Sequence, residues 1–287
     1  MSSTKHTAVL LIHCPDQKGI VAAISDFLLK NNGNVVDIEQ HVEKDIRHFF
    51  MRVEWELEDF AIPRDKINEY FGTLIGNRYD MHWQLHFSDK KPRMALFVSK
   101  MSHCLYDILQ RAMSSEWEVE IPLIVGNHEN LKYIAERFEI DFHHFPITKA
   151  TKPEQEAKEI ELLRQHEVDF VVLARYMQIL SDDFVAAFPN RIINIHHSFL
   201  PAFIGARPYH AAHKRGVKII GATSHYVTAD LDEGPIIVQQ TNSVSHKDSV
   251  KDLIRKGKNL EKMVLSEAIY LQLQHKILPY NNRTIVF

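Results

Sequence analysis

Glycine is scarce in this chain: only 10 of the 287 residues are glycine, and neither GxGxxG nor GxxxxGK[ST] occurs. Loops of those two forms hold dinucleotides and nucleoside triphosphates, so we expect neither ligand. Cysteine is scarcer still, with Cys14 and Cys104 alone and no CxxC spacing. Two separate thiols provide no disulfide framework, which predicts a protein of the reducing cytoplasm.

Positive charge and apolar length are also limited. The 34 Lys and Arg residues are outnumbered by 37 Asp and Glu, a net charge of −3, so we expect no nucleic-acid or acidic-membrane partner. No apolar stretch approaches the ~20 residues that cross a bilayer. The apolar stretch near the N-terminus is too short for a secretory signal. At 45% hydrophobic and 25% charged residues, the composition is typical of a globular protein of one or two domains.

Residues 1–88 predict a small α+β domain. Helices are expected from Ile20 and after Pro63, and a loop over Cys14–Gly19. The predicted strands are Ala8–His13, Val35–Val42, His48–Glu56 and Met81–Phe87. This βαββαβ order is ferredoxin-like, and the polar run Ser88–Pro92 is the expected linker.

Residues 93–287 predict a doubly wound α/β domain with a mostly parallel sheet. Short apolar runs of the kind found in buried parallel strands alternate with helical stretches. The strands are expected at Met94–Val98, Pro122–Val125 and Phe170–Ala174, and the helices at Cys104–Met113, Leu131–Phe138 and Pro153–His166. The region Ser249–His275 predicts one long helix or two.

Three polar residues stand out near the middle of this second region. Asn194 and His196 alternate with isoleucines, a strand pattern that puts both on one face. Asp232 follows 36 residues after His196, just before Gly234-Pro235. A carboxamide, an imidazole and a carboxylate suit acyl or formyl chemistry. The spacing fits equally well a turn-capping Asn194 and a half-buried core His196.

The motifs around these residues carry a resemblance. NIHHSFLPAF, ARPYHAAHKRGVKIIGATSHYV and LDEGPIIVQQ, in that order, resemble the folate-dependent formyltransferase family. The deformylase branch of the family, which hydrolyses 10-formyltetrahydrofolate, is the more similar one. His197 stands where the transferases usually have Pro, VLARYMQILSDDFV matches the deformylase form, and an extra N-terminal domain precedes the motifs. With its Asp16-x-x-Gly19 loop, that domain resembles an ACT domain.

The resemblance implies hydrolysis of 10-formyltetrahydrofolate to formate and tetrahydrofolate, which supplies formate for purine synthesis and balances the one-carbon pool, with no cofactor and no metal. Asn194 and His196 would hold the oxyanion. Asp232 would either order the water and accept its proton or keep His196 charged. Glu233 is the rival carboxylate, but the D-x-G-x-I pattern of the family falls on Asp232.

Further residues are implied as ligand contacts. Met177, Gln178, Ile179 and Leu180 would line the pterin pocket, although Ile179 and Leu180 also fit a core-packing loop. His197 would position water or block an amine. Asp16 and Gly19 would bind an amino-acid effector such as glycine or methionine at an ACT–ACT interface of a homo-oligomer; the alternative is a purely structural or oligomerising module.

Other functional classes remain open at this stage. A metallohydrolase would draw its ligands from the following residues, although no HxxxH or HExxH spacing surrounds them: His143, His144, His196, His197, His225 and Asp232. A formyltransferase would act on an amine, and an amino-acid sensor would need only the first domain. In the ribonucleotide formyltransferases, the loop equivalent to Ser99–Cys104 is glycine-rich and holds the substrate phosphate. Here it contains no glycine, which favours hydrolysis over transfer.

Overall fold

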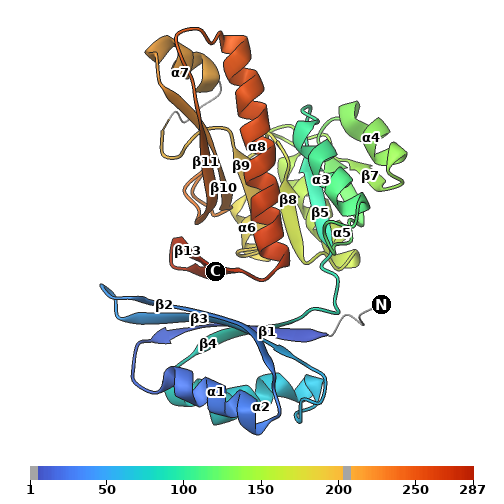
Figure 1. The fold of residues 1–287 in the computed structure, drawn as a ribbon. Helices are drawn as coiled ribbons and strands as arrows, with labels where there is room; N and C mark the ends of the chain where they lie inside the picture. The colour runs from blue at the N-terminus through green and yellow to red at the C-terminus, as the bar shows by residue number, and fades with distance from the viewer. Residues whose placement is uncertain (1–5, 203–207) are drawn as a thin grey trace. The chain divides into compact units, whose positions relative to one another are not determined.

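The computed structural model describes residues 6–202 and 208–287, and the chain divides into two compact units (Figure 1). Unit 1 contains the chain up to Lys91 together with His275–Leu278 and Ile285–Phe287, and unit 2 contains Pro92–Gln274 and Pro279–Thr284. The last residues of the chain therefore group with unit 1, whereas the sequence placed everything after residue 93 in one domain. Phe203, the final residue of the NIHHSFLPAF motif, lies outside the described residues.

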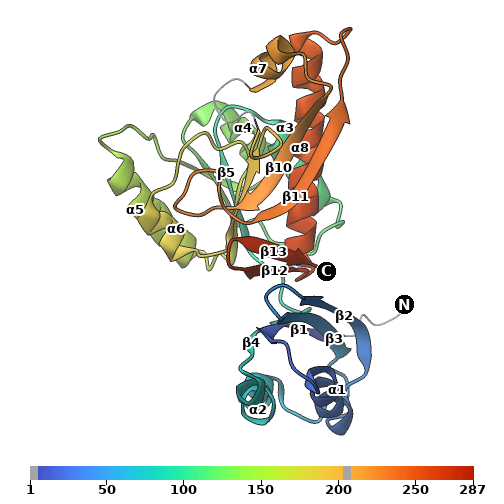
Figure 2. The same cartoon turned by 90° about the vertical axis from the view of Figure 1, so that its left-hand side faces the viewer.

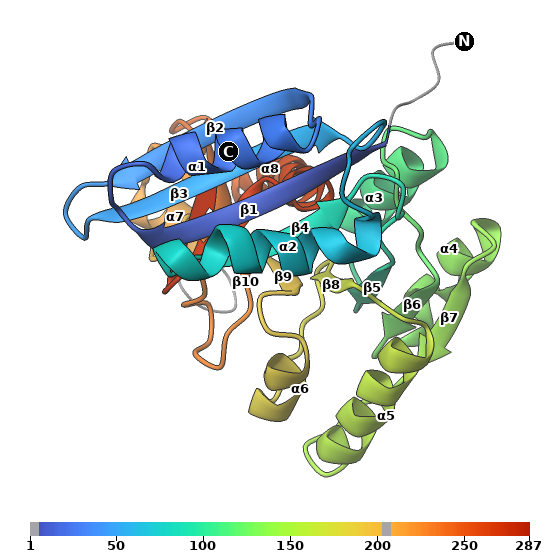
Figure 3. The same cartoon turned by 90° about the horizontal axis from the view of Figure 1, so that it is seen from below.

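Unit 1 has the predicted βαββαβ order. Its antiparallel sheet has the strand order β2-β3-β1-β4, and both helices lie on one face of it (Figure 3). The elements are β1 (Thr7–Pro15), α1 (Ile20–Lys30), β2 (Val35–Glu43), β3 (His48–Glu56), α2 (Ile67–Leu74) and β4 (His82–Phe87), with 3-10 turns η1 (Arg64–Lys66) and η2 (Gly76–Tyr79).

The prediction of a loop over Cys14–Gly19 is wrong for its first two residues. Cys14 and Pro15 belong to β1, where they lie opposite Phe49 and His48 of β3. Proline is tolerated at the end of a strand, so the pairing with β3 decides their conformation, and the proline signal in the sequence does not.

Unit 2 contains a seven-stranded sheet of order β11-β10-β9-β8-β5-β6-β7. The strands from β9 to β7 are parallel, and β10 and β11 add antiparallel pairs at one edge. The strands are β5 (Met94–Val98), β6 (Leu123–Gly126), β7 (Asp141–His144), β8 (Phe170–Leu173), β9 (Ile192–His196), β10 (Ile219–Tyr226) and β11 (Ile236–Ser243). The predicted mostly parallel α/β domain is confirmed.

Helices cover both faces of this sheet, with α3 and α8 on one side and α5 and α6 on the other (Figure 2). The helices are α3 (His103–Met113), the turn η3 (Glu129–Leu131), α4 (Lys132–Arg137), α5 (Lys152–Gln165), α6 (Asp182–Ala187), α7 (Pro208–Arg215) and α8 (Val250–Leu273). The region that predicted one helix or two forms the single helix α8, and Ser249 and Asp252 close its first turn in a capping box. A short hairpin of β12 (Ile277–Tyr280) and β13 (Arg283–Val286) follows.

The strand order creates a switch point in the sheet. From β5 the chain proceeds outward to β6 and β7, then returns to place β8 and β9 on the other side of β5. Open α/β sheets bind ligands where the order reverses, beyond the carboxyl ends of the strands. In the part of the chain that the structure describes, no helix is long and apolar enough to cross a membrane.

Candidate active site

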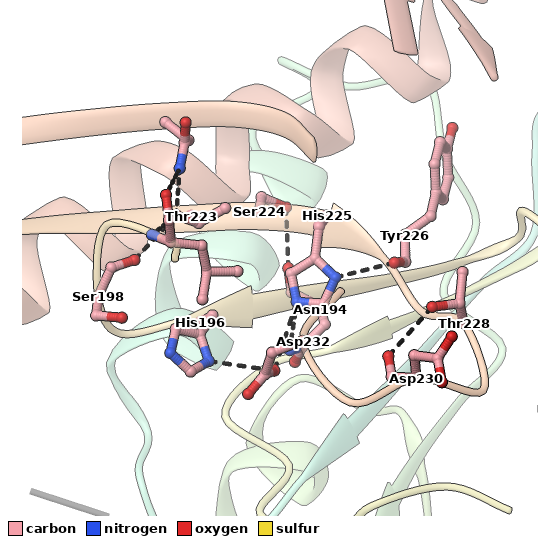
Figure 4. Close-up of polar contacts among 12 residues, drawn as sticks. Asn194, His196, Ser198, Thr223, Ser224, His225, Tyr226, Thr228, Asp230 and Asp232 are labelled. Atoms are coloured by element: carbon pink, nitrogen blue, oxygen red, sulfur yellow. Dashed lines mark hydrogen bonds and ion pairs between the residues drawn. The ribbon is translucent and has the colours of Figure 1, made fainter. Parts of the chain in front are cut away.

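A cavity of about 270 Å³ lies beyond the carboxyl ends of β8 and β9. Three segments of unit 2 line it: Leu173–Leu180 after β8, Asn194–His197 at the end of β9, and Val227–Asp232 between β10 and β11. The fold therefore brings Asn194, His196 and Asp232 to one cavity from two different segments (Figure 4).

Asn194 makes its contact across the sheet. It lies opposite His225 of β10, and its Nδ2 is 3.2 Å from His225 Nε2. His225 Nδ1 is 2.9 Å from the Tyr226 carbonyl oxygen, which can only accept, so Nδ1 carries a hydrogen. In the neutral ring Nε2 then accepts one Asn194 amide hydrogen, which leaves the other free for a ligand. Asn194 lies within a strand and caps no turn.

His196 is buried, at 6% exposure, and is held by one ring nitrogen only. Its Nδ1 lies 3.2 Å from Asp232 Oδ1, while its Nε2 is buried without a hydrogen-bond partner. Buried polar atoms in proteins almost always have a partner. The unpartnered nitrogen in a cavity wall therefore distinguishes His196 from a satisfied core histidine and presents it to a ligand.

Asp232 lies between two histidines. The His196 Nδ1–H, 3.2 Å away, and then the nearby His225 ring, whose Nε2 is 3.7 Å away, hold the pKa of Asp232 well below its usual range. The carboxylate is therefore ionised at neutral pH and binds a proton weakly. Its neighbour Glu233 is exposed and does not line this cavity.

The loop that carries Asp232 requires a glycine two residues later. A Cβ on Gly234 would lie 1.8 Å from the Tyr226 carbonyl oxygen, the same oxygen to which His225 Nδ1 donates. Asp232 itself has a left-handed backbone, with φ of 57°. The close approach at Gly234 and the turn at Asp232 together place the carboxylate beside both histidines.

The segment Met177–Leu180 lines the cavity as the sequence predicted. Met177 and Ile179 are 56% and 59% exposed, whereas Leu180 is buried and also belongs to the hydrophobic core on the α5 and α6 side. Leu180 therefore both lines the cavity and packs in the core, the two alternatives that the sequence left open. Ile179 lines the cavity and does not pack in the core.

His197 also lines the cavity, and it borders two smaller ones. Burial, followed by the nearby Arg175 and His196, lowers the pKa of His197 to about 4. The ring is therefore neutral at pH 7. Asp16 and Gly19 belong to unit 1, where Gly19, with φ of 93°, begins α1 without a side-chain cap.

Of the residues considered for the metal alternative, His196, His225 and Asp232 lie together in the site, whereas the fold keeps two other histidines apart from them. His143 and His144 lie on β7, at the opposite end of the strand order from His225 on β10. Among residues 6–202 and 208–287, the group with ligand atoms close enough to hold an ion is His103, Cys104 and Glu261. There Glu261 already receives His103 Nε2 and the Tyr209 hydroxyl, each at 2.7 Å.

Comparison with known proteins agrees with this geometry. The family model described as formyl transferase matches residues 92–269, and that of the ACT domain matches residues 8–59. A formyltetrahydrofolate deformylase of Synechocystis is 57% identical over 98% of both chains. The chain belongs to the formyltetrahydrofolate deformylase family.

Solved structures separate this family from the transferases. The crystal structure of a formyltetrahydrofolate deformylase from Pseudomonas syringae pv. tomato has a TM-score of 0.96 and 41% identity, over 100% of this chain and 96% of that one. The structure of a glycinamide ribonucleotide transformylase from Symbiobacterium toebii has a TM-score of 0.64 and 32% identity. That match covers 71% of this chain and 98% of the transformylase. The deformylase likeness thus extends over both units.

Sequence reasoning did not assign His225 to the hydrolytic site. The residue occurs in the TSHYV part of a family motif, but its importance comes from lying opposite Asn194 on a strand 31 residues away. Thr223 was missed too: its buried hydroxyl donates to Ser198 O and accepts from Leu200 N, and so fixes the chain that leaves β9. Only the antiparallel pairing of β9 and β10 reveals either role.

Proposed function

We propose that this chain hydrolyses 10-formyltetrahydrofolate to formate and tetrahydrofolate, and that Asn194, His196 and Asp232 carry the reaction. Family membership supports the substrate and the hydrolytic outcome. The observation that carries the residue assignment is the unpartnered Nε2 of His196, a residue that lines the same cavity as Asn194. Two hydrogen-bonding groups with spare capacity are what a formyl group and a water molecule need.

The chemistry begins with water adding to the formyl carbon. His196 Nε2 accepts a water proton as the C–O bond forms, and the carbonyl oxygen becomes an oxyanion that the free Asn194 N–H stabilises. Donors of this kind contribute ~10²–10³ in rate. The imidazolium then passes its proton to the folate nitrogen as the C–N bond breaks, and the second water proton leaves as formic acid ionises to formate.

Asp232 acts through His196 in this scheme. A carboxylate with a depressed pKa is a poor proton acceptor, but at 3.2 Å it fixes the His196 tautomer and stabilises the imidazolium. Of the two roles considered from the sequence, we propose the one that acts through His196: Asp232 orients the neutral ring and stabilises its charge once it has accepted the water proton. Met177, Gln178, Ile179 and Leu180 provide the surface for the pterin ring, and neutral His197 closes the cavity beside His196.

No amine acceptor and no metal are part of the proposal. The glycine-free loop Ser99–Cys104 is engaged with protein: Ser99 Oγ donates to Asn127 Oδ1, and His103 contacts Glu261. The test incubates the protein with 10-formyltetrahydrofolate alone, with and without exhaustive chelation, and follows formate and tetrahydrofolate. We expect equal turnover in both. Turnover that requires an amine, or that stops on chelation and returns with Zn²⁺, contradicts the proposal.

We further propose that the ACT-like unit binds an amino acid, glycine or methionine, at the loop Asp16–Gly19 within a homo-oligomer. The first turn of α1 has no side-chain cap at Gly19, and such N–H groups favour a carboxylate. Titration of amino acids into the hydrolysis assay should change turnover, and Asp16→Ala should abolish the response while Asp26→Ala, on α1, should not. If no amino acid alters turnover of the full chain, this regulatory role is wrong.

A further inference from the structure

Two buried glutamates lie behind the segment that lines the folate cavity. Glu156 and Glu159, one helical turn apart on α5, are 2% and 0% exposed. Both contact that segment: the Ser181 N–H donates to Glu156 Oε1 at 3.1 Å, and the Tyr176 hydroxyl donates to Glu159 Oε1 at 3.4 Å. Burying a carboxyl group costs free energy, and two apolar residues would fill the same helix face without that cost.

The second oxygen of each glutamate has no partner. Oε2 of Glu156 and Oε2 of Glu159 are both buried without a hydrogen bond. Residues three apart on a helix are neighbours, and neighbouring buried carboxylates are not both ionised because like charges repel strongly in a low dielectric. Burial, and then the charge of Glu156, raises the pKa of Glu159 to about 8. The pair therefore keeps one proton at neutral pH.

The segment is also attached at its beginning. The Met177 N–H donates to Ser99 Oγ at 2.9 Å. The segment Tyr176–Ser181 is thus held from behind at its first, second and last residues. The side chains of Met177, which is attached through its backbone, and of Ile179 remain exposed in the cavity wall. Two of these three attachments end on the glutamate pair.

We propose that Glu156 and Glu159 position the segment Tyr176–Ser181 for folate binding without touching the substrate. The inference rests on the proposed function. Loss of the proton on Glu159 would set two carboxylates against each other and move α5 away from the segment, so folate affinity should fall. Asn194 and His196 come from β9 and would keep their places, so kcat should change less than KM.

Few other groups titrate near the pair. On α5, Lys152 lies 3.8 Å from Glu156. From the segment, Tyr176 faces Glu159, and its own pKa is raised by burial. From β5, the Phe97 ring packs edge to face against the Tyr176 ring, with the ring centroids 5.3 Å apart. From α6, the nearby residue is Ser181, the N-cap of that helix. Proton loss from Glu159 is therefore the ionisation expected to act on the segment near pH 8.

The test compares Glu159→Gln, which is nearly isosteric and cannot ionise, with Glu161→Gln, an exposed glutamate of the same helix. For the wild type and for Glu161→Gln, we expect KM for 10-formyltetrahydrofolate to rise ~10-fold between pH 7 and 9, the effect of losing one buried contact. For Glu159→Gln, KM should stay flat. Glu159→Leu should already raise KM ~10-fold at pH 7, with kcat nearly unchanged.

Thermal melting provides a readout that is independent of turnover. The folded-state pKa of Glu159 is raised from 4.5 to about 8, so the folded wild type should lose melting temperature relative to Glu159→Gln as pH rises from 4.5 to 8, and not beyond. A KM rise that persists in Glu159→Gln, or a loss of kcat instead of affinity in Glu159→Leu, overturns the inference. If the wild type releases no formate, the proposed function fails, and the dissociation constant of tetrahydrofolate tests the pair alone.

Discussion

His196 has one ring nitrogen without a partner because the other is held by Asp232. The 3.2 Å contact at Nδ1 fixes the tautomer, and in the proposed reaction the unpartnered Nε2 is the atom that exchanges protons. Asn194 is arranged in the same way, since His225 takes one amide hydrogen and leaves the other. Each of the two side chains proposed to be catalytic is thus oriented by a second residue that we do not expect to touch the reacting carbon.

Replacing Asp232 by Asn should separate binding from chemistry. The amide keeps the volume but loses the charge that stabilises the His196 imidazolium, so we expect kcat to fall ~10²–10⁴-fold. The dissociation constant of tetrahydrofolate should change little. Rapid-quench or steady-state formate release measures the first quantity and fluorescence titration the second. Glu233→Gln, next along the chain but exposed, should cost much less; a larger loss in Glu233→Gln would reverse the assignment.

His225 should matter through Asn194. His225→Phe keeps a ring in the sheet but removes the acceptor at 3.2 Å from Asn194 Nδ2, so the amide loses its fixed orientation. We expect kcat to fall ~10–10²-fold, less than for removal of an oxyanion donor itself. His144→Phe, a strand histidine on β7, serves as the control. Equal rates in wild type and His225→Phe would show that Asn194 is oriented by other means.

At the scale of elements, the site depends on three connections that the sheet brings together. The segment after β8 lines the cavity proposed to hold folate, the end of β9 carries Asn194 and His196, and the β10–β11 loop carries Asp232. The loop returns tightly, with the Tyr226 N–H donating to Pro235 O at 2.9 Å. The tight return leaves no room for a side chain at Gly234.

Gly234→Ala should therefore disturb the site from a distance. The added methyl would collide with the Tyr226 carbonyl, which also accepts from His225 Nδ1. Overpacking of this kind costs about 1–3 kcal/mol, and we expect kcat to fall at least ~10-fold as His225 moves. Urea unfolding and formate release measure the two effects. At Gly216 a Cβ meets nothing within 4 Å, but the backbone is left-handed, with φ of 70°. Gly216→Ala should therefore lower stability and keep activity, and loss of activity in both variants would point to general destabilisation.

At the scale of the whole molecule, both units bury histidines that resist protonation. Burial is the main cause that lowers the pKa of His13 in unit 1 and of His197 in unit 2, each to about 4. Their ordinary value is 6.5. Between those values the unfolded chain binds more protons than the folded one, so stability should decrease as pH falls through that window.

Acid melting should expose this dependence. Between pH 7 and 4, the His197 shift corresponds to roughly 3 kcal/mol of lost stability, because the ring is only 9% exposed. His197→Gln should melt with a shallower dependence on pH in that range, as measured by calorimetry in matched buffers. His210→Gln, an exposed position, should behave as the wild type does. Identical acid profiles for His197→Gln and wild type would mean that His197 is protonated without cost.

Local patterns in the chain were enough to predict much of the architecture. The sequence predicted β3 at its observed ends, and a short apolar run did the same for β5. Alternation of apolar and polar residues put Asn194 and His196 on one strand. Helical spacing located α3 and α5 to within a residue. These properties depend on neighbours in the sequence, because side-chain period follows directly from strand and helix geometry. The family motifs added Asp232 and the segment Met177–Leu180.

Contacts between distant parts of the chain could not be predicted in this way. His225 acquires a partner only because β10 pairs with β9, and Glu156 and Glu159 read as ordinary helix glutamates until α5 packs against the segment Tyr176–Ser181. The same holds for Cys14, which the proline signal placed in a loop and β3 places in a strand. Burial, partner and pKa are properties of the three-dimensional surroundings, and strand order assembles those surroundings from segments that no local pattern connects.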